Sequence, residues 1–300
     1  MAQSFTVRGG SKPAQSSVRR KVLVTGAAGN IGSYFAEHGR KKYDLRLMVR
    51  PTDDEQAIKK LSKWGEVVKA ELSELERLKE HCVGIDTIVH MAANPSPNTD
   101  WESALNDNII GTYNIFVAAK SAGCRRVIYA SSIHAVSGYP DDVQVKTSEP
   151  VNPGDLYGVT KCFGEALGRY MAEKEGVSCI ALRIGAFQPL EAAEQEKGIW
   201  MMDAFVSRRD LNQLIEKSID VENLTFAILH GLSNNRFKRL DISDARELVG
   251  YDPQDDLTDI NPDIKKLHLR KRVHSHNVKD EQQKSGIRNE VAPPRRRTRR

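Results

Sequence analysis

The run Val22-Leu-Val-Thr-Gly26-Ala-Ala-Gly29-Asn-Ile-Gly32 joins a short apolar strand, a glycine-rich turn and the start of a helix. Glycines allow the positive dihedral angles of a tight turn and let the backbone approach a pyrophosphate, which the N-terminus of the next helix attracts. At a first strand-to-helix junction this pattern predicts a dinucleotide site rather than a merely structural turn. The residues expected to contact the cofactor here are Gly26, Gly29, Asn30, Ile31 and Gly32.

Short apolar runs alternate with longer amphipathic stretches from about residue 21 to residue 185. This alternation is typical of repeated strand and helix units around a parallel sheet. The sequence therefore predicts an α/β protein with a doubly wound parallel sheet, whose ligands bind beyond the carboxyl ends of the strands. Strands are expected at Lys21 to Thr25, Asp44 to Val49, Glu66 to Lys69, Asp86 to His90, Arg125 to Ala130 and Ser178 to Arg183, and helices are expected to begin near Asn30, Asp53, Leu72, Trp101 and Asp155.

The other segments divide the chain further. Residues 186–260 are less regular, with helices expected around Arg209 to Ser218 and Ser243 to Leu248, and they predict a small substrate-binding cap. Both ends are basic: residues 1–21 carry five Lys or Arg and no acid, and residues 261–300 carry thirteen Lys or Arg against four acids. Blocks of like charge with few large apolar residues bury too little surface to fold. We therefore expect disorder at residues 1–20 and in the basic tail at 261–300, on either side of the dinucleotide-binding domain at 21–185 and the cap.

The choice of dinucleotide depends on the end of the second strand, where a carboxylate binds the adenosine ribose of NAD. Here that strand ends Leu47-Met-Val-Arg50, with no acid at this point. A guanidinium can bind a 2′-phosphate in a bidentate manner, so Arg50 favours NADP. NAD stays possible, because Asp53 and Asp54 follow closely enough to serve it if the loop folds back.

Tyr157-Gly-Val-Thr-Lys161 places a phenol and an ammonium four residues apart, on one face of the expected helix. A phenol with an ordinary pKa of about 10 is a weak base, but a nearby ammonium stabilises the phenolate. Tyr157 can then accept a proton from an alcohol while hydride leaves for a nicotinamide. Ser132, at the exit of the fifth strand, is expected to hold the reacting oxygen. These three side chains predict the catalytic site, and the cysteine spacing predicts no metal site.

Taken together, the motifs resemble those of the extended short-chain dehydrogenase/reductase family, the superfamily of NAD-dependent epimerases and dehydratases. The resemblance covers about residues 21–260 and implies a Rossmann fold. Within the family the chain looks most similar to uronate dehydrogenase and related sugar dehydrogenases. The motifs that carry the resemblance, in order, are TGAAGNIG, Ile88-Val-His-Met-Ala-Ala93, Asn108-Ile-Ile-Gly-Thr112, Ser131-Ser-Ile-His134, Leu156-Tyr-Gly-Val-Thr-Lys-Cys-Phe-Gly-Glu165 and Leu182-Arg-Ile-Gly185.

The resemblance implies roles for individual residues. It adds Asn108 to the catalytic group of Ser132, Tyr157 and Lys161. The cofactor contacts that it implies, beyond those of the glycine loop and Arg50, are Glu71, Leu72, Met91, Ala92, Ala93, Tyr157, Lys161 and Ile184. The substrate contacts that it implies are Ser96, Ser132, Ile133, His134 and Arg183, with Arg183 meeting a sugar carboxylate. Ile133 departs from the family, because uronate dehydrogenases have an amide there, and this predicts a less hydroxylated substrate.

The expected function is an NAD(P)-dependent dehydrogenase that removes hydride from a sugar or sugar-acid hydroxyl. A nucleotide-sugar epimerase or dehydratase would use the same residues but needs a larger C-terminal domain. A non-enzymatic alternative is a dinucleotide-binding protein whose tail, ending Arg295-Arg-Arg-Thr-Arg-Arg300, contacts nucleic acid.

The surroundings of the protein are also predicted. No stretch is apolar enough for a membrane span, and no secretory signal is present. The N-terminal segment has the composition of a transit peptide but lacks an apolar face, so the cytoplasm is expected. The family implies a homodimer, and residues 108–122 carry enough apolar side chains to face both the sheet and a partner.

Overall fold

The computed structural model describes residues 19–266, and its core is a sheet of seven parallel strands. The strand order is β3-β2-β1-β4-β5-β6-β9, so the order reverses between β1 and β4. The doubly wound parallel sheet that the sequence predicts is thereby confirmed. The strands are β1 (Lys21–Thr25), β2 (Asp44–Val49), β3 (Glu66–Lys69), β4 (Thr87–His90), β5 (Arg126–Ser132), β6 (Ser178–Ile184) and β9 (Phe226–Gly231).

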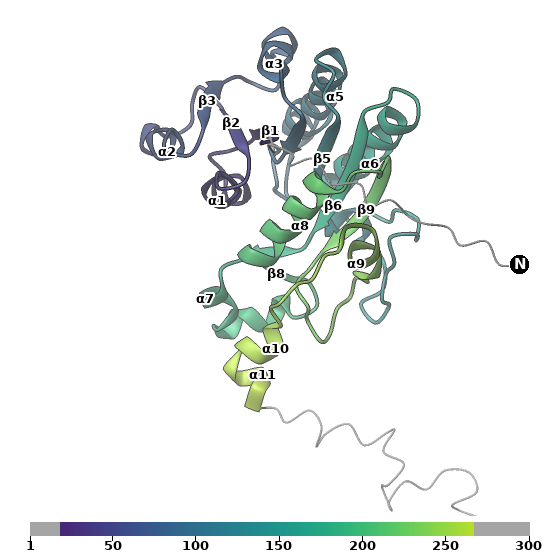
Figure 1. The fold of residues 1–300 in the computed structure, drawn as a ribbon. Helices are drawn as coiled ribbons and strands as arrows, with labels where there is room; N and C mark the ends of the chain where they lie inside the picture. The colour runs from purple at the N-terminus through teal and green to yellow at the C-terminus, as the bar shows by residue number, and fades with distance from the viewer. Residues whose placement is uncertain (1–18, 267–300) are drawn as a thin grey trace, which may run out of the picture.

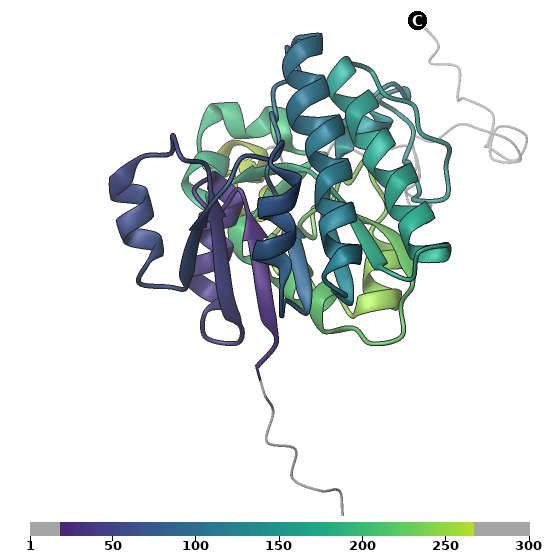
Figure 2. The same cartoon turned by 90° about the horizontal axis from the view of Figure 1, so that it is seen from above.

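Helices cover both faces of this sheet (Figure 1, Figure 2). Figure 2 shows α3 (Leu75–Cys82), α5 (Gly111–Ser121) and α6 (Leu156–Glu173) side by side on one face. On the other face α1 (Asn30–Gly39) packs beside α8 (Arg208–Asp220). The remaining helical elements on this part of the chain are α2 (Glu55–Leu61), α4 (Trp101–Ser103), the π-helix η1 (Ala104–Ile110), the 3-10 helix η2 (Ile133–Val136) and α9 (Ser243–Val249).

Alternation along the strands supplies the two apolar layers. Val22 and Val24 of β1 pack with α1 and α8 in one cluster, whereas Leu23 points to the cluster under α3, α5 and α6. All three side chains are fully buried. A strand covered on both faces presents apolar residues to both, which is why the middle of β1 (22–24) and of β5 (127–130) are continuous apolar runs in the sequence.

The seventh strand corrects the expectation of six. Residues 226–231 lie in the segment expected to be only a cap, but they pair with β6 along its length. A short apolar run cannot be assigned to strand or buried helix from its periodicity, because both give the same pattern. The helix expected around Arg209 to Ser218 is α8 and also packs on the main sheet, against β5.

The rest of residues 186–266 forms a small unit beyond the carboxyl ends of β6 and β9. Strands β7 (Ala186–Gln188) and β8 (Phe205–Ser207) pair as a separate parallel sheet. Phe205 and Leu257 are buried at the centre of this unit. Its helices are α7 (Leu190–Ala193), the 3-10 helix η3 (Glu196–Met201), α10 (Leu257–Ile260) and α11 (Pro262–Lys266).

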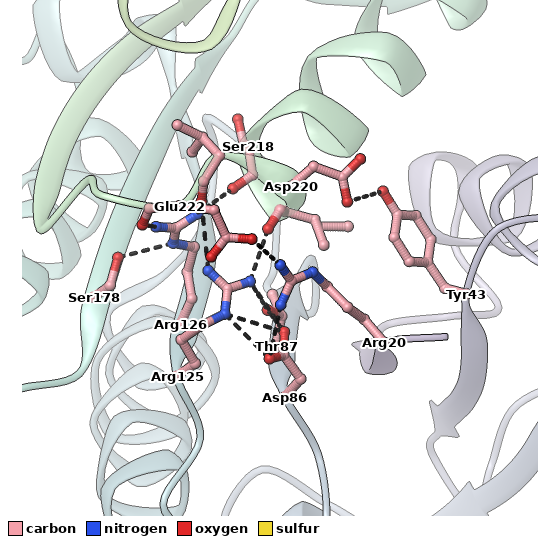
Figure 3. Close-up of polar contacts among 12 residues, drawn as sticks. Arg20, Tyr43, Asp86, Thr87, Arg125, Arg126, Ser178, Ser218, Asp220 and Glu222 are labelled. Carbon is pink, nitrogen blue, oxygen red and sulfur yellow. Dashed lines mark hydrogen bonds and ion pairs between the residues drawn. The ribbon is translucent and has the colours of Figure 1, made fainter. Parts of the chain in front are cut away.

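At the amino ends of the strands, an arginine cluster ties the connection between α8 and β9 to β5 (Figure 3). The side chain of Arg126 is buried and uses all of its N–H donors. Its acceptors are Ser178 Oγ and the carbonyls of Ser218, Val221, Glu222 and Leu224. Arg125 binds both carboxylate oxygens of Asp86. The cluster therefore fixes the last strand of the sheet to its centre.

The predictions for the N-terminal segment and for the basic tail concern residues 1–18 and 267–300, which lie outside the described residues. Within residues 19–266, no helix has the length and apolar character that a membrane crossing requires.

Candidate active site

The glycine turn follows β1 as predicted. Gly26 has φ +64°, and a Cβ there would lie 2.8 Å from the amide nitrogen of Ala92, so only glycine fits. A Cβ on Gly32 would lie 2.3 Å from the carbonyl oxygen of Gly26. The turn therefore brings β1, β4 and the start of α1 into contact. No side chain caps α1 at Gly29, which leaves its first N–H groups available to a ligand.

A cavity of about 580 Å³ opens beside this turn, at the reversal of strand order. Its size and its glycine-lined floor fit a dinucleotide. Among its lining residues are these predicted cofactor contacts: Gly26, Gly29, Asn30, Ile31, Gly32, Arg50, Glu71, Leu72, Met91, Ala92 and Ala93. Asp107 and Phe187 also line the cavity, and neither is among the predicted contacts. Asp107 adjoins the Asn108 motif, whereas nothing in the local sequence marked Phe187.

Arg50 and Asp53 form one unit at the far end of this cavity. Asp53 accepts hydrogen bonds from the backbone N–H of Arg50 at 2.8 Å and from its Nε and Nη2 at 3.2 Å. The Arg50 side chain is 69% exposed and that of Asp53 is 13% exposed. The loop therefore does fold back, and it places a guanidinium and a carboxylate together at the cavity.

Ser132, Tyr157 and Lys161 meet at the carboxyl end of β5. The hydroxyl of Ser132 acts on the phenol of Tyr157, because it lowers the pKa of that phenol, and it accepts from the backbone N–H of His134 at 3.2 Å. The Nζ of Lys161 lies 5.3 Å from the ring centroid of Tyr157 and 5.2 Å from that of Tyr129. All three candidate catalytic side chains are more than nine-tenths buried. The structure therefore brings together the three groups that the sequence selected.

Burial sets the proton affinities of this group. It raises the pKa of Tyr157 above its ordinary value, and the hydroxyl of Ser132 opposes that rise. Burial also lowers the pKa of Lys161 to about 7. The expected depression of the Tyr157 pKa is thus not found in the free protein. The physical reason is that burial acts on both groups, and an amine with this pKa is only partly charged at neutral pH.

Asn108 holds two parts of the site together. It lies fully buried in η1, its Oδ1 accepts from the backbone N–H of Asn94 at 2.8 Å, and its Nδ2 donates to Asn94 O and to Thr160 Oγ1 at 3.1 Å. These bonds join the loop after β4 to α6, one residue from Lys161. The contacts of Asn108 therefore position the catalytic helix.

His134 lies against the catalytic tyrosine. Its ring centroid is 5.4 Å from that of Tyr157 with an interplanar angle of 69°. Next to it, Ile133 lines a second cavity of about 270 Å³ between η2 and η3. Trp200, 89% exposed, and Arg239 line the same cavity. Neither of these two residues was identified from the sequence.

Seven predicted cofactor or substrate contacts line neither of the two cavities, namely Ser96, Ser132, His134, Tyr157, Lys161, Arg183 and Ile184. Arg183 does not face an open cavity: it is 1% exposed, and its Nε and Nη2 each donate to Glu165 at 2.8 Å. Glu165 neutralises its charge, whereas its Nη1 has no partner within residues 19–266, so a contact between Arg183 and a sugar carboxylate stays a prediction. The Oγ of Ser96 accepts from Asn98, and Ser96 lines neither cavity. Ile184 is buried beside Ser132 in the sheet and lines neither cavity.

Within residues 19–266, no cluster of three or more His, Cys, Asp or Glu side chains has an arrangement that would hold a metal ion.

The fold and the site define a dinucleotide-binding α/β protein with a Ser, Tyr and Lys constellation. Residues 22–188 match the NAD dependent epimerase/dehydratase family, and the chain belongs to that family.

Characterised relatives cover most of the chain. It is 33% identical to the NAD-dependent glucose-6-phosphate dehydrogenase of Haloferax volcanii, over 78% of this chain and 93% of that protein. It is 28% identical to the uronate dehydrogenase of Pseudomonas putida, over 78% of this chain and 84% of that protein. A mutant uronate dehydrogenase from Agrobacterium tumefaciens, solved in complex with NAD, superposes with a TM-score of 0.71, at 29% identity, covering 83% of this chain and 89% of that one.

Proposed function

We propose that this protein is an NAD(P)-dependent oxidoreductase that removes hydride from a hydroxyl of a sugar or sugar acid. The observation that carries the proposal is the meeting of the Tyr157 phenol, the Ser132 hydroxyl and the Lys161 amine at the carboxyl end of β5. The neighbouring strand β4 runs into Met91, Ala92 and Ala93, which line the glycine-floored cavity. Two relatives over most of the chain carry the names of sugar or sugar-acid dehydrogenases, which supports this substrate class.

The residues divide the chemistry among them. Ser132 donates a hydrogen bond that orients the substrate oxygen, and Tyr157 accepts the proton of the reacting hydroxyl. Lys161, when charged, stabilises the phenolate form of Tyr157 that accepts this proton, through the short distance and the low local polarity. The glycine turn and the uncapped start of α1 bind the pyrophosphate. The dinucleotide, when bound, supplies the hydride acceptor.

Initial-rate assays with NAD and NADP against hexuronates, aldoses and aldose 6-phosphates test the proposal. Replacing Tyr157 by Phe should lower kcat at least about a hundredfold, since general base catalysis contributes that much, while the cofactor still binds. Tyr139→Phe is the control, because the Tyr139 hydroxyl donates to the carbonyl of Pro150 and Tyr139 lines neither cavity. Equal activity of the two variants, or no turnover of any sugar by the wild type, would refute the proposal.

For the cofactor, we propose that NADP is preferred and NAD is also used. Use of NADP rests on the exposed Arg50 guanidinium, which lines the cavity and can bind a 2′-phosphate. Use of NAD rests on the Asp53 carboxylate, which the folded-back loop brings to the same cavity. Arg50→Ala should raise KM for NADP about tenfold and leave KM for NAD unchanged. Lys59→Ala, on the neighbouring helix α2, is the control. An equal change for both cofactors would count against this role.

We further propose a homodimer that forms through α4, η1, α5 and α6. These neighbouring helices expose several large apolar side chains, which is costly in water and typical of an interface. The exposed residues are Trp101, Ile110, Tyr113, Val159 and Tyr170. Sedimentation velocity should give a dimer for the wild type and a monomer for Tyr113→Glu, whereas Val83→Glu on the loop after α3, 65% exposed, should leave the dimer intact.

A cytoplasmic location is proposed on chemical grounds. The four cysteines are free thiols, and Cys82, Cys124 and Cys179 are buried. Free thiols persist in a reducing compartment. Fractionation of cells that express the full chain tests this location.

A further inference from the structure

The carboxylate of Asp155 has two partners, one on each oxygen. Its Oδ1 accepts from the backbone N–H of Gly158 at 2.7 Å and so caps the start of α6. Its Oδ2 lies 2.6 Å from Nδ1 of His134. An N-cap needs only the first contact, so the second calls for a separate explanation.

The second contact determines where His134 carries its proton. An ionised carboxylate only accepts hydrogen bonds, so the Nδ1 of His134 must be the donor. In the neutral ring, Nε2 is then an unprotonated acceptor. No residue between 19 and 266 bonds to Nε2, and the side chain of His134 is 31% exposed. The ring contacts Tyr157 edge-on, so this acceptor lies in the same site as the catalytic phenol.

The backbone holds this pair rigidly. The amide of His134 donates to Ser132 Oγ at 3.2 Å. A Cβ on Gly158 would lie 2.3 Å from the carbonyl oxygen of His134, so α6 begins in direct contact with η2. Two hydrogen bonds therefore hold His134, one at its backbone amide and one at Nδ1. Nε2 is the other nitrogen of the ring and takes part in neither bond.

We propose that Asp155 is a positioning residue that keeps His134 protonated on Nδ1, so that Nε2 accepts a hydrogen bond from a substrate hydroxyl next to the one that Tyr157 deprotonates. This inference rests on the proposed function for its substrate, but the protonation of His134 can be measured without any substrate. Asp155 thus acts on the substrate through another side chain.

Two substitutions separate the cap from the histidine contact, because Asn and Ser are both good N-cap residues. In Asp155→Asn the amide oxygen caps α6 and its NH₂ group faces the ring, which forces the proton of His134 to Nε2. In Asp155→Ser the side chain is too short to reach the ring, which frees both tautomers. Both variants should fold with the melting temperature of the wild type.

Long-range ¹H–¹⁵N NMR on protein labelled with ¹⁵N-histidine reports the tautomer, with His134→Gln identifying the resonance. The wild type should show His134 protonated on Nδ1, Asp155→Asn should show it on Nε2, and Asp155→Ser should show a mixture. A wild-type ring protonated on Nε2, or no change in Asp155→Asn, overturns the proposal.

Kinetics then test the link to the substrate, using the best sugar from the assay panel. With Nε2 protonated, the substrate hydroxyl can no longer donate its proton to His134 and must accept from it instead, so Asp155→Asn should raise KM about tenfold. The change in kcat of Asp155→Asn, and the change in KM of Asp155→Ser, should be smaller. In a His134→Ala background neither variant should have a further effect. Losses that persist in that background overturn the proposal. If no sugar is turned over, the proposed function fails, and the NMR result still decides the tautomer.

Discussion

The two ends of strand β5 both have buried cations nearby, and these cations differ in their partners. At the amino end Arg126 is 1% exposed, and every one of its donors has an acceptor. At the carboxyl end Lys161 is 3% exposed, lies over two aromatic rings, and burial alone lowers its pKa to about 7. Saturated hydrogen bonding stabilises a fold, whereas an uncompensated buried charge costs stability and is kept where chemistry needs it. Arg126 and Lys161 are therefore equally buried, but the first stabilises the fold and the second lowers its stability in return for a place in the candidate catalytic site.

The largest effect should come from breaking the amino end. Arg126→Leu removes the guanidinium from four carbonyls and from the Ser178 hydroxyl, and only the carbonyls of Leu224 and Val221 keep another side-chain donor. The free energy of unfolding should therefore fall by about 3–5 kcal/mol. Urea denaturation measures the loss, and kcat of the remaining folded enzyme should be unchanged. Arg77→Ala, which removes a half-exposed ion pair with Glu74, should stay within about 0.5 kcal/mol. If Arg126→Leu and Arg77→Ala lowered the free energy of unfolding by similar amounts, the hydrogen bonds of Arg126 would contribute no more stability than an exposed ion pair.

The opposite change is expected at the carboxyl end. Lys161→Met should abolish turnover and yet stabilise the fold below pH 7, because it removes a buried charge. In the wild type the unfolded chain holds the lysine proton up to about pH 10.5, whereas the folded chain releases it near pH 7. Wild-type stability should therefore rise relative to the Met variant above pH 7, by about 1.4 kcal/mol per pH unit. Parallel pH profiles of the two proteins would contradict this assignment.

A smaller effect should appear in acid. Burial lowers the pKa of His230 on β9 to about 4 from 6.5, and its Nδ1 donates to the carbonyl of Asp241 at 2.7 Å. As the pH falls from 6.5 to 4 the unfolded chain takes up a proton that the folded chain refuses. Stability should fall by about 1.4 kcal/mol per pH unit over this window. His230→Asn keeps a donor and should flatten the profile by that amount, and an unchanged slope would exclude His230 as its source.

The sequence predicted the nucleotide half of the molecule well because its determinants are local. The positive φ at Gly26 and the close backbone contact at Gly32 each require a glycine, so both positions can be recognised in the sequence. Strands that are buried on both faces can be recognised by their apolar runs. Tyr157 and Lys161 share one helix, so their spacing alone places them together. Features of this kind can be recognised from the sequence alone, because they do not depend on contacts between distant segments.

The substrate half was predicted less well because its contacts are made between distant segments. Arg183 is neutralised by Glu165 from another element, and no spacing rule predicts that pairing. The cavity near Ile133 is closed by Trp200 and Arg239, which come from separate parts of the chain. The pKa of Tyr157 depends on how deeply the helix is buried, which the motif does not encode.

The π-helix η1 (Ala104–Ile110) has a consequence for how this chain would respond to the deletion of one residue. Residues 101–121 form one continuous helical rod whose middle section, Ala104–Ile110, has π geometry and carries the fully buried Asn108. A π-bulge holds one residue more than a regular turn, so deleting a single residue there can restore regular pitch without breaking the rod. Each residue turns an α-helix by about 100°, so such a deletion would swing Asn108 away from Asn94 and Thr160. Deletion of one residue from η1 would therefore keep the helix but remove the hydrogen bonds by which Asn108 holds the loop after β4 to α6.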